Sequence, residues 1–212
     1  MTGLLLLLAG LAWPAVMAVP DSHHARLADF VGSWNIHTRF WRQPDMEPLE
    51  SDGTAELRLI LGGRFLEQRQ EGTLLGKHTS GIGYVGYDNA KGRYTSLWLD
   101  DLGTAVLQTE GPPDRSGKVI RTHGMIDDAA TGKPLRIEEA MSLVGPDRFT
   151  YEAWTGPPGG KLMRVMQIVY SRRLRKSRRG SSRRVSADPR SSRLRGSRSA
   201  GASLAREGRR SS

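Results

Sequence analysis

Apolar and polar residues alternate along most of this chain between residues 32 and 170. The first alternating stretch puts one set of side chains on one face of a strand, Trp34, Ile36, Thr38 and Phe40, and Asn35, His37 and Arg39 on the other. Clusters of Gly, Pro, Asn and Asp separate this stretch from further runs of the same kind. The predicted strands after the first are 54–61, 64–72, 79–87, 93–99, 104–110, 118–126, 135–144, 148–155 and 162–170.

One short helix is predicted before the strands. Asp21 or Ser22 can serve as its N-cap, Leu27, Phe30 and Val31 form its apolar stripe, and Gly32 ends it.

Neighbouring strands in sequence are joined by short turns, such as Gly62-Gly63 and residues 88–92. Short strands with almost no helix between them favour a barrel or a sandwich over a parallel α/β fold, and sequential hairpins favour the barrel. The predicted fold is all-β, an antiparallel up-and-down barrel of about 8–10 strands, which is wide enough to hold one small ligand.

Composition divides the chain into three segments. Residues 1–18 resemble a secretory signal peptide with an apolar stretch of about 15 residues, too short to span a bilayer, which predicts an exported protein without a membrane span. Residues 19–171 have the composition of one globular domain. The mature domain is expected in the periplasm or outside the cell.

Residues 172–212 form an Arg- and Ser-rich tail that is predicted to be disordered. The tail carries 15 basic residues and two acidic ones, so its net charge of +13 exceeds the +10 of the whole chain and leaves residues 1–171 at −3. Any attraction to nucleic acid would depend on the tail alone. Because the tail has no regular Arg-Ser repeat and no stacking aromatics, we do not expect nucleic acid as the partner, and a translated frameshift explains the tail equally well.

Five sequence blocks together resemble the bacterial domain-of-unknown-function family numbered 1579. They are Gly32-Ser33-Trp34, residues 60–68, residues 86–89, residues 98–100 with Gly103-Thr104, and residues 131–134. The resemblance covers residues 27–170, and the Leu-Gly-Gly-Arg-Phe-Leu-Glu block is its most specific part. It implies a calycin, or lipocalin-like, barrel and implies no particular activity.

Within calycins, the Gly-x-Trp motif implies that Gly32 and Trp34 are structural and that Trp34 lies across the closed end of the barrel. Arg164 or Arg172 is expected to cover the indole ring. A haem-binding branch, the nitrobindins, needs an axial histidine from a late strand. No histidine follows His123, so no haem or other cofactor is predicted.

The hairpin spanning residues 118–144 contains the most suggestive polar residues. Arg121 and His123 share a face of its first strand, and Glu139 lies on the apolar face of the second. Pairing in which residue numbers add to 260 would set Arg121 opposite Glu139. If that face points inward, a cation, an imidazole and a carboxylate would meet a ligand in the cavity. Alternatively, the pair is a surface ion pair and Lys118, Ile120 and Thr122 line the interior.

Three further candidates are Trp98 and Asp100, which share a face with Tyr94 and Ser96, and Glu67, which shares a face with Phe65 and Arg69. An inward aromatic beside a carboxylate can hold a ligand or, once its pKa is raised by burial, protonate it. A structural role in a satisfied polar pair is the alternative for each.

Other chemistry has little support. The chain has no cysteine, no His-x-His or His-x-x-x-His spacing suited to a metal, and no Gly-x-Ser-x-Gly nucleophile elbow. Gly81 and Gly83 lie within a strand pattern, where glycine relieves barrel curvature rather than binding phosphate.

The sequence therefore predicts an exported barrel that binds a small, partly apolar molecule through Glu67, Trp98, Asp100, Arg121, His123 and Glu139. An enzyme using an interior carboxylate with histidine or tyrosine is the second hypothesis, and a module that binds polyanions through its tail is the third. A closed barrel leaves few strand edges, which favours a monomer.

Overall fold

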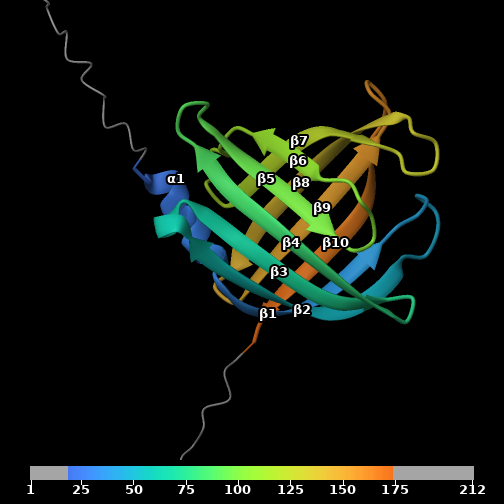
Figure 1. Ribbon diagram of the computed structural model, residues 1–212, viewed down its shortest axis with the longest axis horizontal. Coiled ribbons are helices and arrows are strands. Elements are labelled where there is room, and N and C mark those ends of the chain that lie inside the picture. Colours follow the sequence, from blue (N-terminus) through green and yellow to red (C-terminus); the bar gives the residue numbers. More distant parts are fainter. Residues whose placement is uncertain (1–18, 174–212) are drawn as a thin grey trace, which may run out of the picture. The chain divides into compact units, whose positions relative to one another are not determined.

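The computed structural model describes residues 19–173, and the predicted signal peptide and nearly all of the basic tail lie outside these residues. Ten strands form a closed antiparallel barrel in which each strand pairs with its neighbours in sequence and β1 pairs with β10 (Figure 1). The predicted up-and-down barrel is confirmed. Its strands are β1 (Gly32–Phe40), β2 (Leu49–Ile60), β3 (Phe65–Leu74), β4 (Lys77–Asp88), β5 (Arg93–Asp100), β6 (Leu107–Gly111), β7 (Val119–Asp127), β8 (Pro134–Gly145), β9 (Arg148–Gly156) and β10 (Met163–Arg172).

Two predicted elements differ in detail. The N-terminal helix is one α-turn, α1 (Ser22–Ala25), capped by Asp21 and followed by a 3-10 helix, η1 (Arg26–Phe30). The turn at Gly62-Gly63 is a second 3-10 segment, η2 (Leu61–Gly63), rather than a two-residue hairpin, and both glycines have positive φ. No helix among residues 19–173 has the length and apolar character needed to cross a bilayer.

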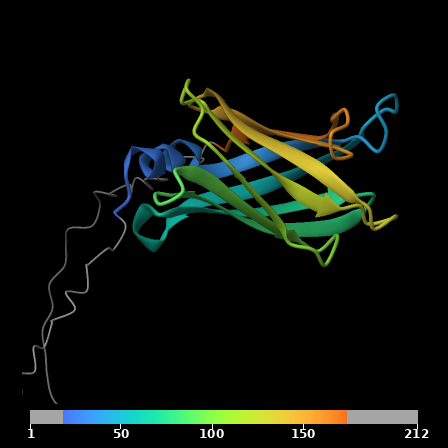
Figure 2. The same ribbon diagram turned by 90° about the horizontal axis from the view of Figure 1, so that it is seen from above.

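α1 and η1 cover one end of the barrel, opposite the loop between β1 and β2 (Figure 2). Leu27 and Phe30 of η1 are completely buried, and the Phe30 ring meets Phe149 edge to face with centroids 5.1 Å apart. The Trp34 indole N–H donates to the Phe30 carbonyl over 3.1 Å. This end is therefore filled by the main hydrophobic core.

Arg172 completes the closed end. Its guanidinium carbon lies 4.2 Å from the centre of the Trp34 ring, and its Nη1 donates to the Val31 carbonyl over 2.9 Å. A Cβ atom on Gly32 would lie 2.3 Å from Arg172 Nη1, so the Gly-x-Trp glycine makes room for this arginine. Of the two arginines considered for this position, Arg172 occupies it, whereas Arg164 lies over Trp41.

Pairing registers decide which side chains face inward, because side chains alternate between the two faces of each strand. Trp34 and Ile36 of β1 are buried inside, and the register of each successive strand carries that face around the barrel. The predicted division of β1 into two faces is confirmed, and the face with Trp34 and Ile36 is the inward one.

The register of β7 with β8 corrects one prediction. Thr122 lies opposite Glu139 and Arg121 lies opposite Ala140, so paired residue numbers add to 261 rather than 260. The hairpin closes at Asp127 and Pro134 around a loop in which Asp128 accepts from the backbone N–H of Thr131 and Gly132 has a positive φ. A shift of one residue sends every side chain of a strand to the other face, so Arg121 and Glu139 lie on opposite sides of the barrel wall.

Candidate functional site

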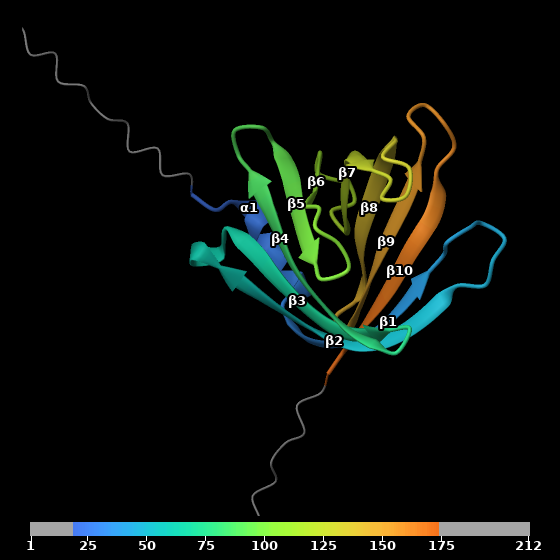
Figure 3. The ribbon, with the colours of Figure 1, turned by 45° about the vertical axis from the view of Figure 1, so that its right-hand side comes forward.

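The barrel interior differs between its two ends. At the end covered by η1, most inward side chains are almost fully buried, while Tyr87 and Leu143 are partly buried and Leu59 is exposed near the end of β2. The other end is the one with the loop between β1 and β2 (Figure 3). Towards it, inward side chains from nearly every strand are only half-buried, which means that solvent reaches the interior from this open end. These residues include Thr38, Phe40, Ser51, Gln68, Gln70, Leu74, Ser96, Trp98, Asp100, Leu107, Leu135, Tyr151, Thr155 and Met166.

A buried glutamate lies beside this open interior. Glu139 is 4% exposed, and its Oε2 accepts from Thr109 Oγ1 over 2.5 Å and is 3.2 Å from Thr122 Oγ1. Its Oε1 accepts from the Tyr151 hydroxyl over 2.5 Å. Burial, and then the neighbouring Glu139 carboxylate, raises the pKa of Tyr151 well above its usual value, so the phenol keeps its proton and acts as a donor.

A second polar cluster spans the interior from β10 to β3. The Tyr170 hydroxyl accepts from Gln70 Nε2 over 2.5 Å and from Gln68 Nε2 over 3.4 Å. Tyr170 is fully buried, and burial raises its pKa. Its ring stacks on Phe149 of the closed end, so this cluster borders the filled half of the barrel.

Trp98 lies flat against the barrel wall. A Cβ atom on Gly81 would come within 2.2 Å of Trp98 Cζ2, and one on Gly83 within 2.7 Å of Trp98 Cε3. The indole N–H donates to Asp100 Oδ2 over 2.9 Å, while Asp100 Oδ1 accepts from the Leu102 backbone N–H. The two glycines in β4 thus make room for an aromatic ring, which the curvature argument had not anticipated.

The structure brings only part of the predicted site together. Glu139, Trp98 and Asp100 face inward, whereas Arg121 and His123 are exposed on the outer face of β7. Arg121 lies 5.7 Å from the ring centre of Trp154 on that outer face. The interior is lined by Ile120 and Thr122, as the alternative interpretation of this hairpin proposed, but together with Glu139.

Glu67 also belongs to the outer face, although it is only 5% exposed. Arg58 Nε donates to its Oε2 over 2.5 Å and Arg69 Nη2 to its Oε1 over 3.1 Å. These hydrogen bonds, Arg69 first and then Arg58, lower the pKa of Glu67. The geometry is that of an ion pair holding β2 to β3, with both acceptor oxygens occupied.

Sequence reasoning missed Tyr151 and the two glutamines as interior residues. Gln68 and Gln70 follow Leu66 on the inward face of β3, so extending the alternation from Leu66 would have found them. Predicting that Tyr151 and Thr109 lie beside Glu139 would have required the registers of four strands, β6 to β9. Within residues 19–173, no group of three or more His, Asp or Glu side chains is placed to hold a metal ion.

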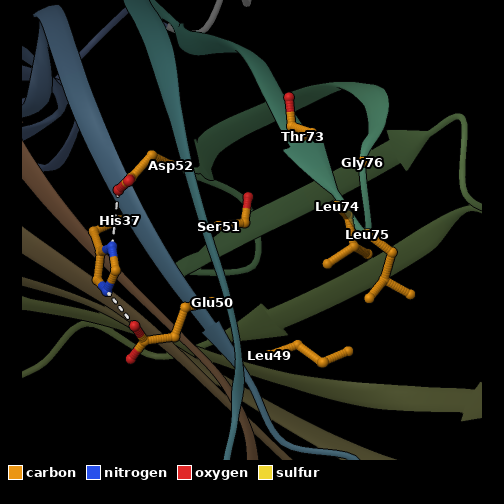
Figure 4. A pocket seen from close by; sticks show the side chains of 9 residues that line it. All are labelled: His37, Leu49, Glu50, Ser51, Asp52, Thr73, Leu74, Leu75 and Gly76. Carbon is orange, nitrogen blue, oxygen red and sulfur yellow. Dashed lines mark hydrogen bonds and ion pairs between the residues drawn. The ribbon is translucent and has the colours of Figure 1, made fainter.

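A pocket of about 410 Å³ lies in the wall near the open end. β2 pairs with β1 as far as Leu49, but pairs with β3 only from Gly53, so the two strands diverge there. Figure 4 shows the pocket between them, with His37 set between Asp52 and Glu50 at one side. His37 Nδ1 lies 2.8 Å from Asp52 Oδ1, and Arg39 binds Glu50 over 2.9 Å, so the carboxylates here already have basic partners.

Comparisons with known proteins give the family and the fold. The crystal structure of Rv2717c from M. tuberculosis is similar at 20% identity and a TM-score of 0.53, covering 74% of this chain and 100% of that one. A de novo designed fluorescence-activating β-barrel matches at 16% identity and a TM-score of 0.40, covering 69% of this chain and 96% of that one. No curated protein matches the chain. Residues 19–172 match the family described as "Protein of unknown function (DUF1579)", and the chain belongs to this family.

Proposed function

We propose that this protein is an exported, monomeric barrel that binds one small, partly apolar molecule in its interior. The observation that carries the proposal is the half-buried state of the inward side chains towards the open end, beside a closed end whose inward side chains are mostly buried. A barrel of this size that was packed throughout would leave these side chains buried.

The lining suits a ligand with an apolar body and a polar group. Leu107, Leu135 and Met166 provide apolar contacts, and the Trp98 indole provides a flat aromatic one. Polar groups come from Asp100 and from the Tyr151 hydroxyl that covers Glu139. Mostly apolar lining with a few placed polar groups is typical of small-molecule sites.

Native mass spectrometry of the full chain, purified gently from its own host, tests the proposal. We expect a non-covalent adduct that is lost on denaturation. Trp98→Ala should lose or weaken the adduct, because Trp98 faces the interior. Trp154→Ala is the matched control, because Trp154 lies on the outer face and its loss should leave the adduct unchanged. An empty wild-type barrel, or equal loss from both variants, would contradict interior binding.

Catalysis by an interior acid is a second candidate, favoured by the Tyr151–Glu139 hydrogen bond. The histidine version of this hypothesis loses its support, because the histidines within residues 19–173 lie on the outer face or at the closed end. The raised pKa keeps the Tyr151 hydroxyl protonated, which suits it to donate a hydrogen bond to negative charge that develops on a substrate. If the barrel is an enzyme, its purified ligand should change mass on incubation with wild type and stay unchanged with Tyr151→Phe.

A further inference from the structure

The charged groups of the barrel interior are unevenly distributed. Two carboxylates, Asp100 and Glu139, take inward positions. Among the described residues, the basic side chains at inward strand positions are Arg172, which is held at the closed end by Trp34 and backbone carbonyls, and Lys77, which is exposed at the β3–β4 turn. The solvent-reached interior between these two ends therefore has acidic groups without a basic partner from residues 19–173.

A comparison with Glu67 shows what the chain does elsewhere for a buried carboxylate. Glu67 and Glu139 are 5% and 4% exposed, yet Glu67 is held by two arginines and Glu139 by hydroxyl groups alone. Hydroxyl donors satisfy the hydrogen-bonding capacity of a carboxylate but do not neutralise its charge. Within the described part of the chain, the interior carboxylate thus lacks the counter-charge that its counterpart on the outer face possesses.

The aromatic side chain Trp98, which lines the same space, also favours a cationic ligand. One face of Trp98 rests on the backbone of β4 at Gly81 and Gly83, which leaves the other face towards the interior. The face of an indole carries negative electrostatic potential and attracts organic cations. Asp100, which accepts from the Trp98 N–H, lies at the edge of this ring.

We infer that the ligand of this barrel is an organic cation, in which an ammonium or related positive group is attached to a flat apolar body. The inference rests on the proposed interior binding and adds the charge of the ligand. The cation supplies the missing counter-charge of the interior, and the apolar body occupies the space beside Trp98. An anionic ligand such as a fatty acid would bring a further carboxylate next to Asp100 and Glu139, and between the closed end and Lys77 no basic side chain from residues 19–173 takes an inward strand position to offset it.

Three probes that share one ring system test the inference by isothermal titration calorimetry on the full chain at neutral pH: 2-naphthylmethylamine, 2-naphthylmethanol and 2-naphthoate. We expect the protonated amine to bind about tenfold more tightly than the alcohol. The carboxylate should bind more weakly than either of the other two probes. Binding that persists in Trp98→Ala reports sites outside the barrel, the basic tail included, and is subtracted first.

Three variants assign the preference to residues. Glu139→Gln and Asp100→Asn retain side-chain shape and an acceptor oxygen, and each should reduce the preference for the amine. Glu67→Gln is the matched control, since it removes a carboxylate of nearly equal burial on the outer face and should leave the preference unchanged.

The possible outcomes separate the two proposals. Equal affinity for amine and alcohol, or tighter interior binding of the carboxylate, would overturn the cation inference and leave interior binding intact. A preference for the amine that survives in both interior variants would also overturn it. Failure of all three probes, combined with an empty wild-type barrel in native mass spectrometry, would overturn interior binding itself.

Discussion

Glu67 and Glu139 show how the same residue type acquires different properties from its position in the barrel wall. Glu67 lies on the outer face between two arginines that are themselves largely exposed, whereas Glu139 lies on the inner face among hydroxyl groups. The first arrangement stabilises the fold and gives the carboxylate two basic partners. The second also occupies both carboxylate oxygens, but with neutral hydroxyl groups, beside a solvent-reached interior.

Replacement of Glu67 should change how stability depends on pH. Its pKa is lower in the folded state than in the unfolded chain, so its contribution is fully present above the unfolded-state pKa and is lost as pH falls through the folded-state pKa. We expect Glu67→Gln to reduce the free energy of unfolding at neutral pH and to make its decline between about pH 6 and about pH 3 shallower than in wild type. Urea unfolding at each pH measures this.

Glu47→Gln serves as the control, because Glu47 is exposed in the loop between β1 and β2. Parallel pH profiles for wild type and Glu67→Gln would show that the two arginines do not stabilise the folded state through this carboxylate.

At the level of elements, the N-terminal segment closes the barrel. η1 contributes two completely buried side chains, Leu27 and Phe30, and the Phe30 carbonyl accepts from the Trp34 indole. Trp34 is therefore contacted both by this N-terminal segment and by Arg172, the last residue of β10. This arrangement makes one half of the interior a packed core and confines any ligand to the other half.

Phe30→Ala should lower the free energy of unfolding by about 3–5 kcal/mol, because it leaves a cavity against Phe149 and Trp34. Phe65→Ala is the matched control: Phe65 lies on the outer face and is 37% exposed, so its removal should cost less than half as much. Chemical denaturation followed by circular dichroism provides both values. Similar losses in the two variants would contradict a closing role for η1.

At the scale of the whole molecule, the strand ladder is closed within the described residues. β1 pairs with β10 over seven residue pairs, from Trp34 with Arg172 to Phe40 with Met166, so every strand has two neighbours. Full closure leaves few free strand edges; the ladder is weakest where β2 and β3 diverge before Gly53 and where β6 pairs with β7 at one position, Glu110 with His123. The barrel and its N-terminal cap thus form a closed, self-packed unit.

A protein consisting of residues 19–173 should therefore fold as the full chain does. We expect free energies of unfolding that agree within about 0.5 kcal/mol, since the strand ladder closes and the described hydrophobic core is packed within this range. Thermal and urea unfolding of both proteins measure the difference. A truncated protein that is unfolded, or less stable by more than about 2 kcal/mol, would show that the barrel depends on the terminal segments.

The sequence by itself determined the elements and their order. Alternation of apolar and polar residues fixed the strands to within a few residues, except that β2 begins at Leu49 rather than near residue 54, and short turns between them implied an antiparallel barrel. The pairing of Gly32 and Trp34 with a late arginine also followed from sequence, through the family resemblance. The strands, the turns and the Gly-x-Trp motif are each encoded by residues close together in the sequence, so they can be predicted from local patterns.

Only the tertiary structure decided which candidate residues share one space. A strand pattern shows that Arg121 and His123 lie on the same face, but not whether that face is inside, because a register shift of one residue exchanges the two faces. The same register placed Glu139 opposite Thr122 and separated it from Arg121, and the pairing of β8 with β9 brought Tyr151 beside it. Which carboxylates face the interior depends on the registers of all ten strands, and each register is set by turn geometry and by packing around the whole barrel. The acidic interior therefore cannot be predicted from any single segment of sequence.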